Sequence, residues 1–314
     1  MSVVKSYSFP VGDIRGDMFY IEHNSDNFTI IDCYLKDGED ASCRKDDILK
    51  EIKRIRDVKT ITRFISTHPH NDHFLGIEDL DKQAKIINFY AVANGLPENP
   101  ADVSQTKYIE LRDNENFPIK QGITRKWINE GDDVRGGSGI RFLWPDITNK
   151  EYLEALKKVK EGTNQNDISC VFTYNVGKAK YMWMGDMETD MQNVFFESEK
   201  DRLHSVEVLF HPHHGRKSSA PPKALLEKLD PKIIVIGNAP ADDLNYDDPD
   251  KTITQNKAGD IVFVNEENII HIYTQNEYNE VPKCLEKILG KKDSDIYGHY
   301  IGSLKLTEDK VKKL

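Results

Sequence analysis

The sequence lacks long apolar stretches, paired cysteines and an excess of positive charge. No run approaches the ~18 consecutive apolar residues that a membrane-spanning helix needs, so no membrane contact is expected. The N-terminus has no charged start followed by an apolar stretch, which argues against a secretory signal. The four cysteines are scattered and form no C-x-x-C pair. Reduced thiols and a cytoplasmic location are therefore expected.

Acidic side chains outnumber basic ones across the 314 residues. Lysine and arginine total 43 against 53 aspartates and glutamates, which gives a formal net charge of −10. A protein that binds long duplex nucleic acid through its phosphates usually has a basic face, so the balance disfavours such a partner. A short or small anionic substrate met by bound cations is compatible with it. A protein partner or a homodimer also stays open.

Strand-like and helix-like segments occur in two batches along the chain. In the first batch we expect strands at 18–21, 28–32, 61–66 and 85–90 and a helix at 46–58. In the second batch we expect strands at 140–144, 168–176, 180–185, 206–210, 233–236, 260–264 and 269–273, and helices at 150–160 and 188–199. Two such batches predict an α/β fold with two sheets face to face and helices outside, a four-layer αββα sandwich. This domain is expected to cover residues 1–280, with an insertion at about 94–135. Residues 281–314 are expected to form an extension, part helix and part edge segment, packed on or beside it.

Three of the ten histidines lie in the run His68-Pro69-His70-Asn71-Asp72-His73, which reads H-x-H-x-D-H. The run directly follows the predicted strand at 61–66. Imidazoles and a carboxylate in a loop at a strand end are ligands that zinc, manganese or iron accepts. The run therefore predicts a metal site.

Other polar groups follow predicted strands farther along. Gly185-Asp186 ends one apolar strand, and His213-His214-Gly215 follows another, while the segment 164–169 precedes the strand that starts near residue 170. The alternatives are an N-cap for the helix near 188 in the case of Asp186, and a turn with a partly exposed histidine pair in the case of 213–214. A metal site explains all of these segments together.

The order H-x-H-x-D-H, N-D-x-S before a strand, G-D and H-H-G resembles the metallo-β-lactamase fold. More narrowly, it resembles the hydrolase domain of ComEC-type competence proteins. The stretch from Val11 to Asp17, followed by Ile30-Ile31-Asp32, is similar to the G-x-G-D and L-I-D opening of that branch. The match spans about residues 9 to 275.

The resemblance implies two divalent cations, Zn²⁺ or Mn²⁺, and a set of ligands. The implied ligands are His68 and His70 for the first cation, Asp72 and His73 for the second, Asp186 as the bridge, and one of His213 and His214 to complete the coordination of the second cation. Many members of the superfamily have another histidine at the position of Asn166, about 20 residues before the bridging acid. An amide oxygen or a water at Asn166 would weaken the first site, so a single cation, or manganese in place of zinc, is an open alternative.

Two further residues are expected to support the ligands. Asp32 is expected either to orient a ligand imidazole or simply to form a turn. Ser169 is expected to hydrogen-bond the turn rather than to attack a substrate, because no base is placed to activate it.

The expected chemistry is hydrolysis by a water whose pKa the two cations lower. Asp72 and Asp186 supply two carboxylates, which favour hard ions and phosphoryl oxygens, and Asp72 could also accept a hydrogen bond from the attacking water. These two residues are the catalytic candidates for a phosphodiesterase or nuclease acting on a short or single-stranded nucleic acid or a small nucleotide. Arg216, Lys217 and Ser218 could bind a phosphate oxygen as charge-assisted donors. Their alternative is a solvated loop in which Ser219 caps the next helix.

Two other functions stay open. One is hydrolysis of a thioester, lactone or β-lactam on the same fold. The other is a non-catalytic metal-binding partner protein.

Overall fold

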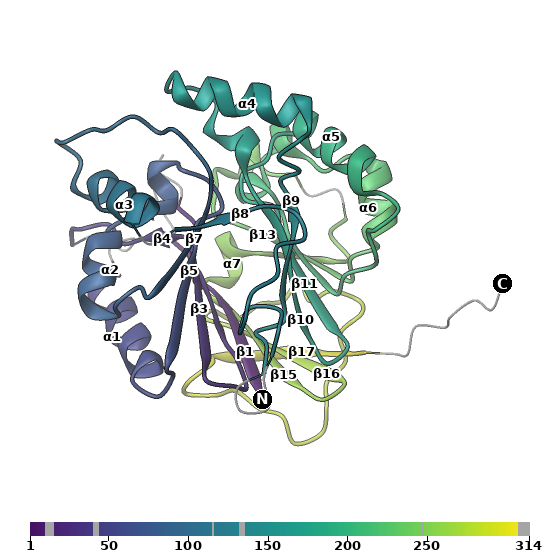
Figure 1. The fold of residues 1–314 in the computed structure, drawn as a ribbon. Helices are drawn as coiled ribbons and strands as arrows, with labels where there is room; N and C mark the ends of the chain where they lie inside the picture. Colours follow the sequence, from purple (N-terminus) through teal and green to yellow (C-terminus); the bar gives the residue numbers. More distant parts are fainter. Residues whose placement is uncertain (10–15, 40–43, 115, 132–135, 246–247, 307–314) are drawn as a thin grey trace.

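The computed structural model describes residues 1–9, 16–39, 44–114, 116–131, 136–245 and 248–306. Two β-sheets face each other, and helices cover their outer faces (Figure 1). The predicted four-layer αββα sandwich is therefore confirmed.

The first sheet runs, in spatial order, through β17 (His299–Lys305), β16 (Ile269–Thr274), β15 (Ile261–Glu266), β1 (Ser2–Ser6), β2 (Phe19–Glu22), β3 (Asn27–Ile31), β5 (Ile61–Ile65), β7 (Asn88–Val92) and β8 (Asn116–Ile119). The second sheet runs through β14 (Thr252–Thr254), β13 (Ile233–Ile236), β12 (Val208–Phe210), β11 (Ala179–Trp183), β10 (Val171–Val176) and β9 (Ile140–Trp144). A small sheet pairs β4 (Cys33–Tyr34) with β6 (Phe74–Leu75).

The helices divide between the two outer faces (Figure 1). Those beside the first sheet are α1 (Lys45–Arg56), α2 (Ile77–Gln83) and α3 (Val103–Asn114). Those beside the second sheet are α4 (Lys150–Lys160), α5 (Thr189–Glu199) and α6 (Lys223–Leu229), and a single turn, α7 (Gln255–Ala258), follows β14. No helix in the described ranges has both the length and the apolar composition needed to cross a bilayer.

Apolar periodicity explains why the layers pack. In α1, the buried residues Ile48, Ile52 and Ile55 repeat at helical spacing and join the core cluster beneath the first sheet. A separate cluster fills the space between the sheets, where the rings of Trp183 and Phe210 stack with centroids 4.5 Å apart.

Parallel pairing places the functional loops at one edge of the sandwich. In the first sheet β3 pairs parallel with β5, and in the second sheet β11 pairs parallel with β12. The carboxyl ends of parallel strands meet at the same edge of a sheet, where ligands of α/β folds commonly bind. The loops that follow these four strands carry Asp32, the H-x-H-x-D-H run, Asp186 and the H-H-G run.

Several predicted elements agree with the structure and several differ. The strand at 140–144 and the helix at 150–160 form with the predicted bounds, and Asn149 caps the helix by accepting from the Tyr152 N–H at 2.9 Å. The region 94–135 contains α3 and also β8, which pairs parallel with β7 and so belongs to the first sheet. The predicted helix after 281 is wrong for the residues described up to 306, where β17 pairs with β16 as an edge strand. The predicted cap at Ser219 is also wrong, because α6 starts after Pro222.

Candidate metal centre

Asp32 contacts the loop after β5 through its carboxylate. Its carboxylate accepts hydrogen bonds from the Thr67 N–H at 2.8 Å and from the Thr67 hydroxyl at 2.7 Å. Oδ2 of Asp32 also lies 2.9 Å from Nδ1 of His73. Asp32 has a left-handed backbone, with φ 54°, a conformation that aspartate tolerates better than most residues. The loop therefore presents His73 with its Nδ1 already engaged.

Asp186 follows β11 through a tight turn at Gly185. Gly185 has φ 53°, and a Cβ there would lie 2.8 Å from Oγ of Ser169 and 3.0 Å from Cβ of Thr67. The same Ser169 hydroxyl accepts from the Asp186 N–H at 3.1 Å. The helix α5 begins at Thr189 and its N-cap residue is Glu188, so Asp186 is not the helix cap.

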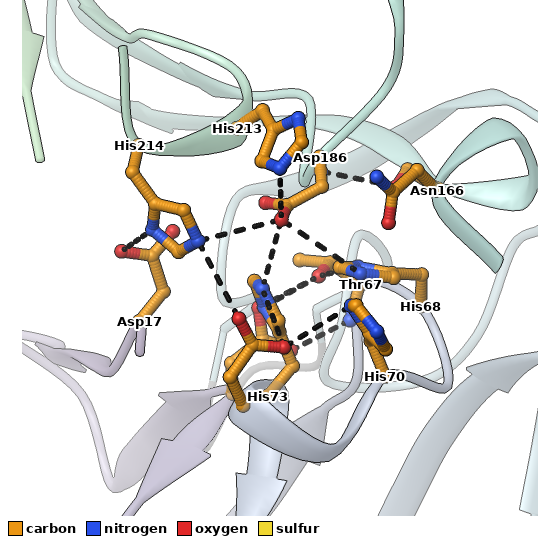
Figure 2. Close-up of polar contacts among 12 residues, drawn as sticks. Asp17, Thr67, His68, His70, His73, Asn166, Asp186, His213 and His214 are labelled. Atoms are coloured by element: carbon orange, nitrogen blue, oxygen red, sulfur yellow. Dashed lines mark hydrogen bonds and ion pairs between the residues drawn. The ribbon is translucent and has the colours of Figure 1, made fainter. Parts of the chain in front are cut away.

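Four imidazoles surround a single oxygen of Asp186 (Figure 2). Measured from Oδ2 of Asp186 to Nε2 of each ring, the distances are 3.3 Å for His73, 3.4 Å for His214, 3.7 Å for His213 and 4.0 Å for His68. The chain thus brings together residues from three loops, the first of which lies more than 100 positions before the other two.

The inward-facing atoms of this cluster fit a cation. Within the described part of the chain, Nε2 of His68, His73 and His214 and both carboxylate oxygens of Asp186 are buried and have no hydrogen-bond partner. A buried polar atom without a partner costs about 1–3 kcal/mol. Nitrogen and oxygen donors that converge in this way match the ligand set of a first-row divalent cation.

The outer nitrogen of each ring is held by a neighbouring group. Nδ1 of His214 lies 3.2 Å from Oδ1 of Asp17, and Nδ1 of His213 lies 3.0 Å from Oε1 of Glu188. Nδ1 of His68 lies 3.1 Å from the Thr67 hydroxyl. Metal-binding histidines usually have such a partner, which fixes the tautomer and the ring orientation.

Asp72 joins the cluster from the open side, while His70 does not contact Asp186. Oδ2 of Asp72 lies 3.7 Å from Nε2 of His214, and Oδ1 lies 3.9 Å from Nε2 of His73. The His70 side chain is 47% exposed, and its Nδ1 lies 3.2 Å from Oδ1 of Asp72. The structure therefore places His70 at the rim of the cluster.

The carboxylates and imidazoles strongly influence one another's charge. Burial alone lowers the pKa of His73, but Asp186, Asp32 and Asp72 together raise it well above its usual value. Burial raises the pKa of Asp186, but His73 and His214 hold it well below its usual range. The carboxylate that faces the four imidazoles is therefore ionised at neutral pH.

The H-H-G loop has an uncommon backbone. His213 has φ 51° and His214 has φ 57°, and Gly215 continues with φ 91°. Non-glycine residues in this region store about 1–3 kcal/mol each and concentrate at functional sites. The backbone here turns both rings toward Asp186 instead of alternating them, as an extended segment would.

The remaining predicted site residues contact other groups. The Asn166 amide donates to Oε1 of Glu188 at 3.1 Å. The Lys217 ammonium donates to the carbonyl of Asp242 at 2.8 Å, and Ser218 is exposed. Nε of Arg216 is buried without a hydrogen-bond partner among the described residues.

Sequence reasoning missed three residues at this centre. Asp17 stands in the opening motif but was given no role, and residues 11–15 of that motif lie outside the described residues. Glu188 was hidden by its place at a helix start, and Ser219 by its resemblance to a helix cap. The signal for Glu188 was its position two residues after Asp186, in a Gly-Asp-Met-Glu run.

Among the described residues, Asp17, His73, Asp186 and His214 form a group in which one possible ligand atom of each lies within 4.8 Å of the others. The structure therefore contains a candidate metal site.

No protein-family model matches the chain, and no curated protein matches it in sequence. Among solved structures, it is similar to CmlA, a diiron β-hydroxylase from Streptomyces venezuelae, with a TM-score of 0.44 and 10% identity over 75% of this chain and 44% of that one. A mutant of the CmlA β-hydroxylase gives a TM-score of 0.45 at 10% identity, over 75% of this chain and 45% of that one. A protein of unknown function from Enterococcus faecalis gives 0.32 at 12% identity, over 67% of this chain and 49% of that one. The chain thus spans under half the length of these structures, and likenesses this distant define no activity for it.

Proposed function

We propose that this protein is a metal-dependent hydrolase that cleaves phosphodiester bonds in a short or single-stranded nucleic acid or in a small nucleotide. The observation that carries the proposal is the ring of four imidazoles around one buried oxygen of Asp186. A network of hydrogen-bonded side chains that served only stability would not leave so many buried donor and acceptor atoms without partners.

Asp186 would bridge two divalent cations, Zn²⁺ or Mn²⁺, with Asp72, His73 and His214 on one of them. Bound there, the cations would supply Lewis acidity and lower the pKa of a bound water. The chain's own contribution is to fix the ligands in place before substrate arrives. Asp32 does this for His73, and Asp17 does it for His214.

The number of carboxylates favours phosphoryl transfer over attack on a neutral carbonyl. Asp72, Asp186 and Asp17 place three carboxylates within or beside the imidazole cluster, and oxygen ligands favour hard cations that bind phosphate oxygens. Burial alone would raise the pKa of Asp72, but His73 and His214 hold it below its usual range, so the side chain is ionised at neutral pH. Asp72 can then accept a hydrogen bond from the attacking water.

Substrate is proposed to approach past His70 and Asp72, whose side chains are 47% and 20% exposed. Arg216 follows the H-H-G loop directly, and its guanidinium would bind a non-bridging phosphate oxygen as a charge-assisted donor. Lys217 is engaged by Asp242, so it would contribute only after that contact is released.

The test is hydrolysis by purified protein with added Mn²⁺ or Zn²⁺. Substrates are bis-p-nitrophenyl phosphate, short single-stranded and duplex oligonucleotides, and a panel of thioesters, lactones and β-lactams. We expect cleavage of the phosphodiesters, with preference for the single strand. Asp186→Asn should lower the rate at least ~100-fold, while Asp201→Asn, which changes an exposed aspartate, should leave it unchanged.

Turnover of the ester or lactam panel without phosphodiester cleavage would assign the alternative hydrolase function. An absence of all activity, together with cation binding that Asp186→Asn does not change, would indicate that the cluster is not a catalytic centre.

A further inference from the structure

His213 is held as firmly as the other imidazoles of the cluster. Its Nδ1 lies 3.0 Å from Oε1 of Glu188 and 2.9 Å from Oγ of Ser219. The Ser219 hydroxyl donates to Oε2 of Glu188 at 2.5 Å. This triangle of contacts occupies Nδ1 of His213. Nε2 of the same ring is directed toward Asp186, 3.7 Å away, as Figure 2 shows.

The contacts around Asp186 fall into two groups. His73 and His214 lie close to Asp186 and also within 3.9 Å of Asp72. His68 and His213 approach the same Oδ2 of Asp186, at 4.0 Å and 3.7 Å. Asp186 therefore lies between a pair of imidazoles shared with Asp72 and a second pair of imidazoles.

Asn166 is linked to one member of the second pair, His213, through Glu188. Its amide nitrogen donates to Oε1 of Glu188, the oxygen that also lies beside Nδ1 of His213. The Asn166 amide group is thus connected to His213 indirectly, through the Glu188 carboxylate. Glu188 is half-buried, and its carboxylate contacts polar groups of three residues, His213, Ser219 and Asn166.

We propose that His213 is itself a cation ligand, together with His68 and Asp186, and that Glu188 is the positioning residue that keeps Nε2 of His213 directed at the cation. The inference rests on the metal-dependent function proposed above and specifies its ligands. Both histidines of the H-H-G run then serve the centre, one at each cation position. The cation position of His68, called the first site in the sequence analysis, obtains an imidazole from residue 213 although residue 166 is an asparagine.

The test is titration of metal-free, full-length protein with Co²⁺, followed by visible absorption and by elemental analysis after desalting. The wild type should bind two Co²⁺ per chain. His213→Asn suits the left-handed backbone at this position, and it should keep one tight site while the affinity of the second falls more than ~100-fold. Glu188→Gln should keep both sites but weaken the second ~10–100-fold, the usual effect of removing a group that orients a ligand.

The matched control is His271→Asn. His271 is buried in β16, where its Nδ1 lies 2.7 Å from the Ser303 hydroxyl, outside the centre. This variant loses a buried imidazole in the same way and should bind two Co²⁺ with wild-type affinity. Circular dichroism of each metal-free variant verifies its fold, and Glu188→Gln decides the matter if His213→Asn does not fold.

Two results overturn the inference. One is a wild type that binds a single Co²⁺, and the other is a second site whose affinity and absorption are unchanged in the His213 or Glu188 variant. The titration contains no substrate, so its outcome is separate from that of the proposed function. The protein could bind two Co²⁺, one of them dependent on His213, and yet cleave no phosphodiester. That result would contradict the proposed function and support this inference.

Discussion

Asp32 and His73 form a buried pair in which Oδ2 of the carboxylate lies 2.9 Å from Nδ1 of the ring. Both side chains are essentially inaccessible to solvent. Because Nδ1 of His73 is engaged by Asp32, Nε2 is the nitrogen of this ring that faces Asp186, 3.3 Å away. The tautomer of this imidazole is therefore set by a residue that does not itself contact the candidate cations.

Replacing Asp32 should thus weaken cation binding without removing a ligand. We expect Asp32→Asn to lower the affinity of the cation position served by His73 by ~10–100-fold, because the amide is a poorer acceptor and no longer raises the basicity of the ring. Asparagine tolerates the left-handed backbone of residue 32, so the turn should persist. Competition with a chromophoric chelator measures the affinity. Wild-type affinity in this variant would show that Asp32 serves only the turn.

Gly185 should be intolerant of even a methyl group. The added Cβ of Gly185→Ala would lie within 3.0 Å of Ser169 and Thr67, in addition to the strain of φ 53°. We expect a loss of about 1–3 kcal/mol in the free energy of unfolding, measured by urea denaturation, and weaker cation binding because Asp186 is displaced.

Gly162→Ala is the control for backbone strain alone. Gly162 also has a left-handed backbone, with φ 80°, but nothing lies within 4 Å of its added Cβ. The Gly162→Ala substitution should lower the free energy of unfolding by about 1 kcal/mol and leave cation binding unchanged. Equal losses in the two variants would contradict the close contact inferred at Gly185.

Cations should stabilise the folded protein. Because the ligands converge only in the folded chain, a free cation concentration of 100 times Kd should add about 2.7 kcal/mol to the stability. This corresponds to a rise of about 4 °C in the melting temperature for a chain of this size. EDTA should reverse the rise, as differential scanning fluorimetry can show. An equal rise in Asp186→Asn would mean that the cations bind elsewhere.

Acid should destabilise the protein partly through Asp260. Arg44 donates to both of its carboxylate oxygens, at 2.6 Å and 2.9 Å, and Lys5 lies 3.2 Å away. Burial would raise the pKa of Asp260, but the positively charged side chains of Arg44 and Lys5 hold this pKa below its usual value in the folded state. The ionised Asp260 side chain therefore stabilises the fold at pH values above about 3.9, the pKa of an aspartate in the unfolded chain. This contribution is lost as the pH falls from there through the lower pKa of Asp260 in the folded state.

Asp260→Asn should therefore be less stable than wild type at pH 7, by about 3 kcal/mol, and the difference should shrink below pH 4. Urea denaturation at several pH values measures both effects. Asp57→Asn removes an exposed partner of Lys53 and should change little at either pH. A constant gap between Asp260→Asn and wild type across the acid range would contradict the assignment.

Much of the fold could be predicted from the sequence because its signals are local. The strand at 140–144 and the helix at 150–160 follow from apolar spacing within a few residues. The predicted helix after 281 failed because that segment is organised by pairing of β17 with β16 and not by its own periodicity. Ser219 looked like a cap because the chain turns there, but its hydroxyl is used by Glu188 and His213.

The sequence by itself determined which ligand types follow which strands, because an apolar run that ends in His68–His73, Asp186 or His213-His214 is visible without coordinates. Only the tertiary structure decided which atoms of those residues meet. The left-handed backbone at 213 and 214 turns both rings inward, and Glu188 lies beside His213 only after two distant turns pack together. The direction of a side chain depends on backbone angles and on neighbours far away in the chain, and neither is written in the order of the residues.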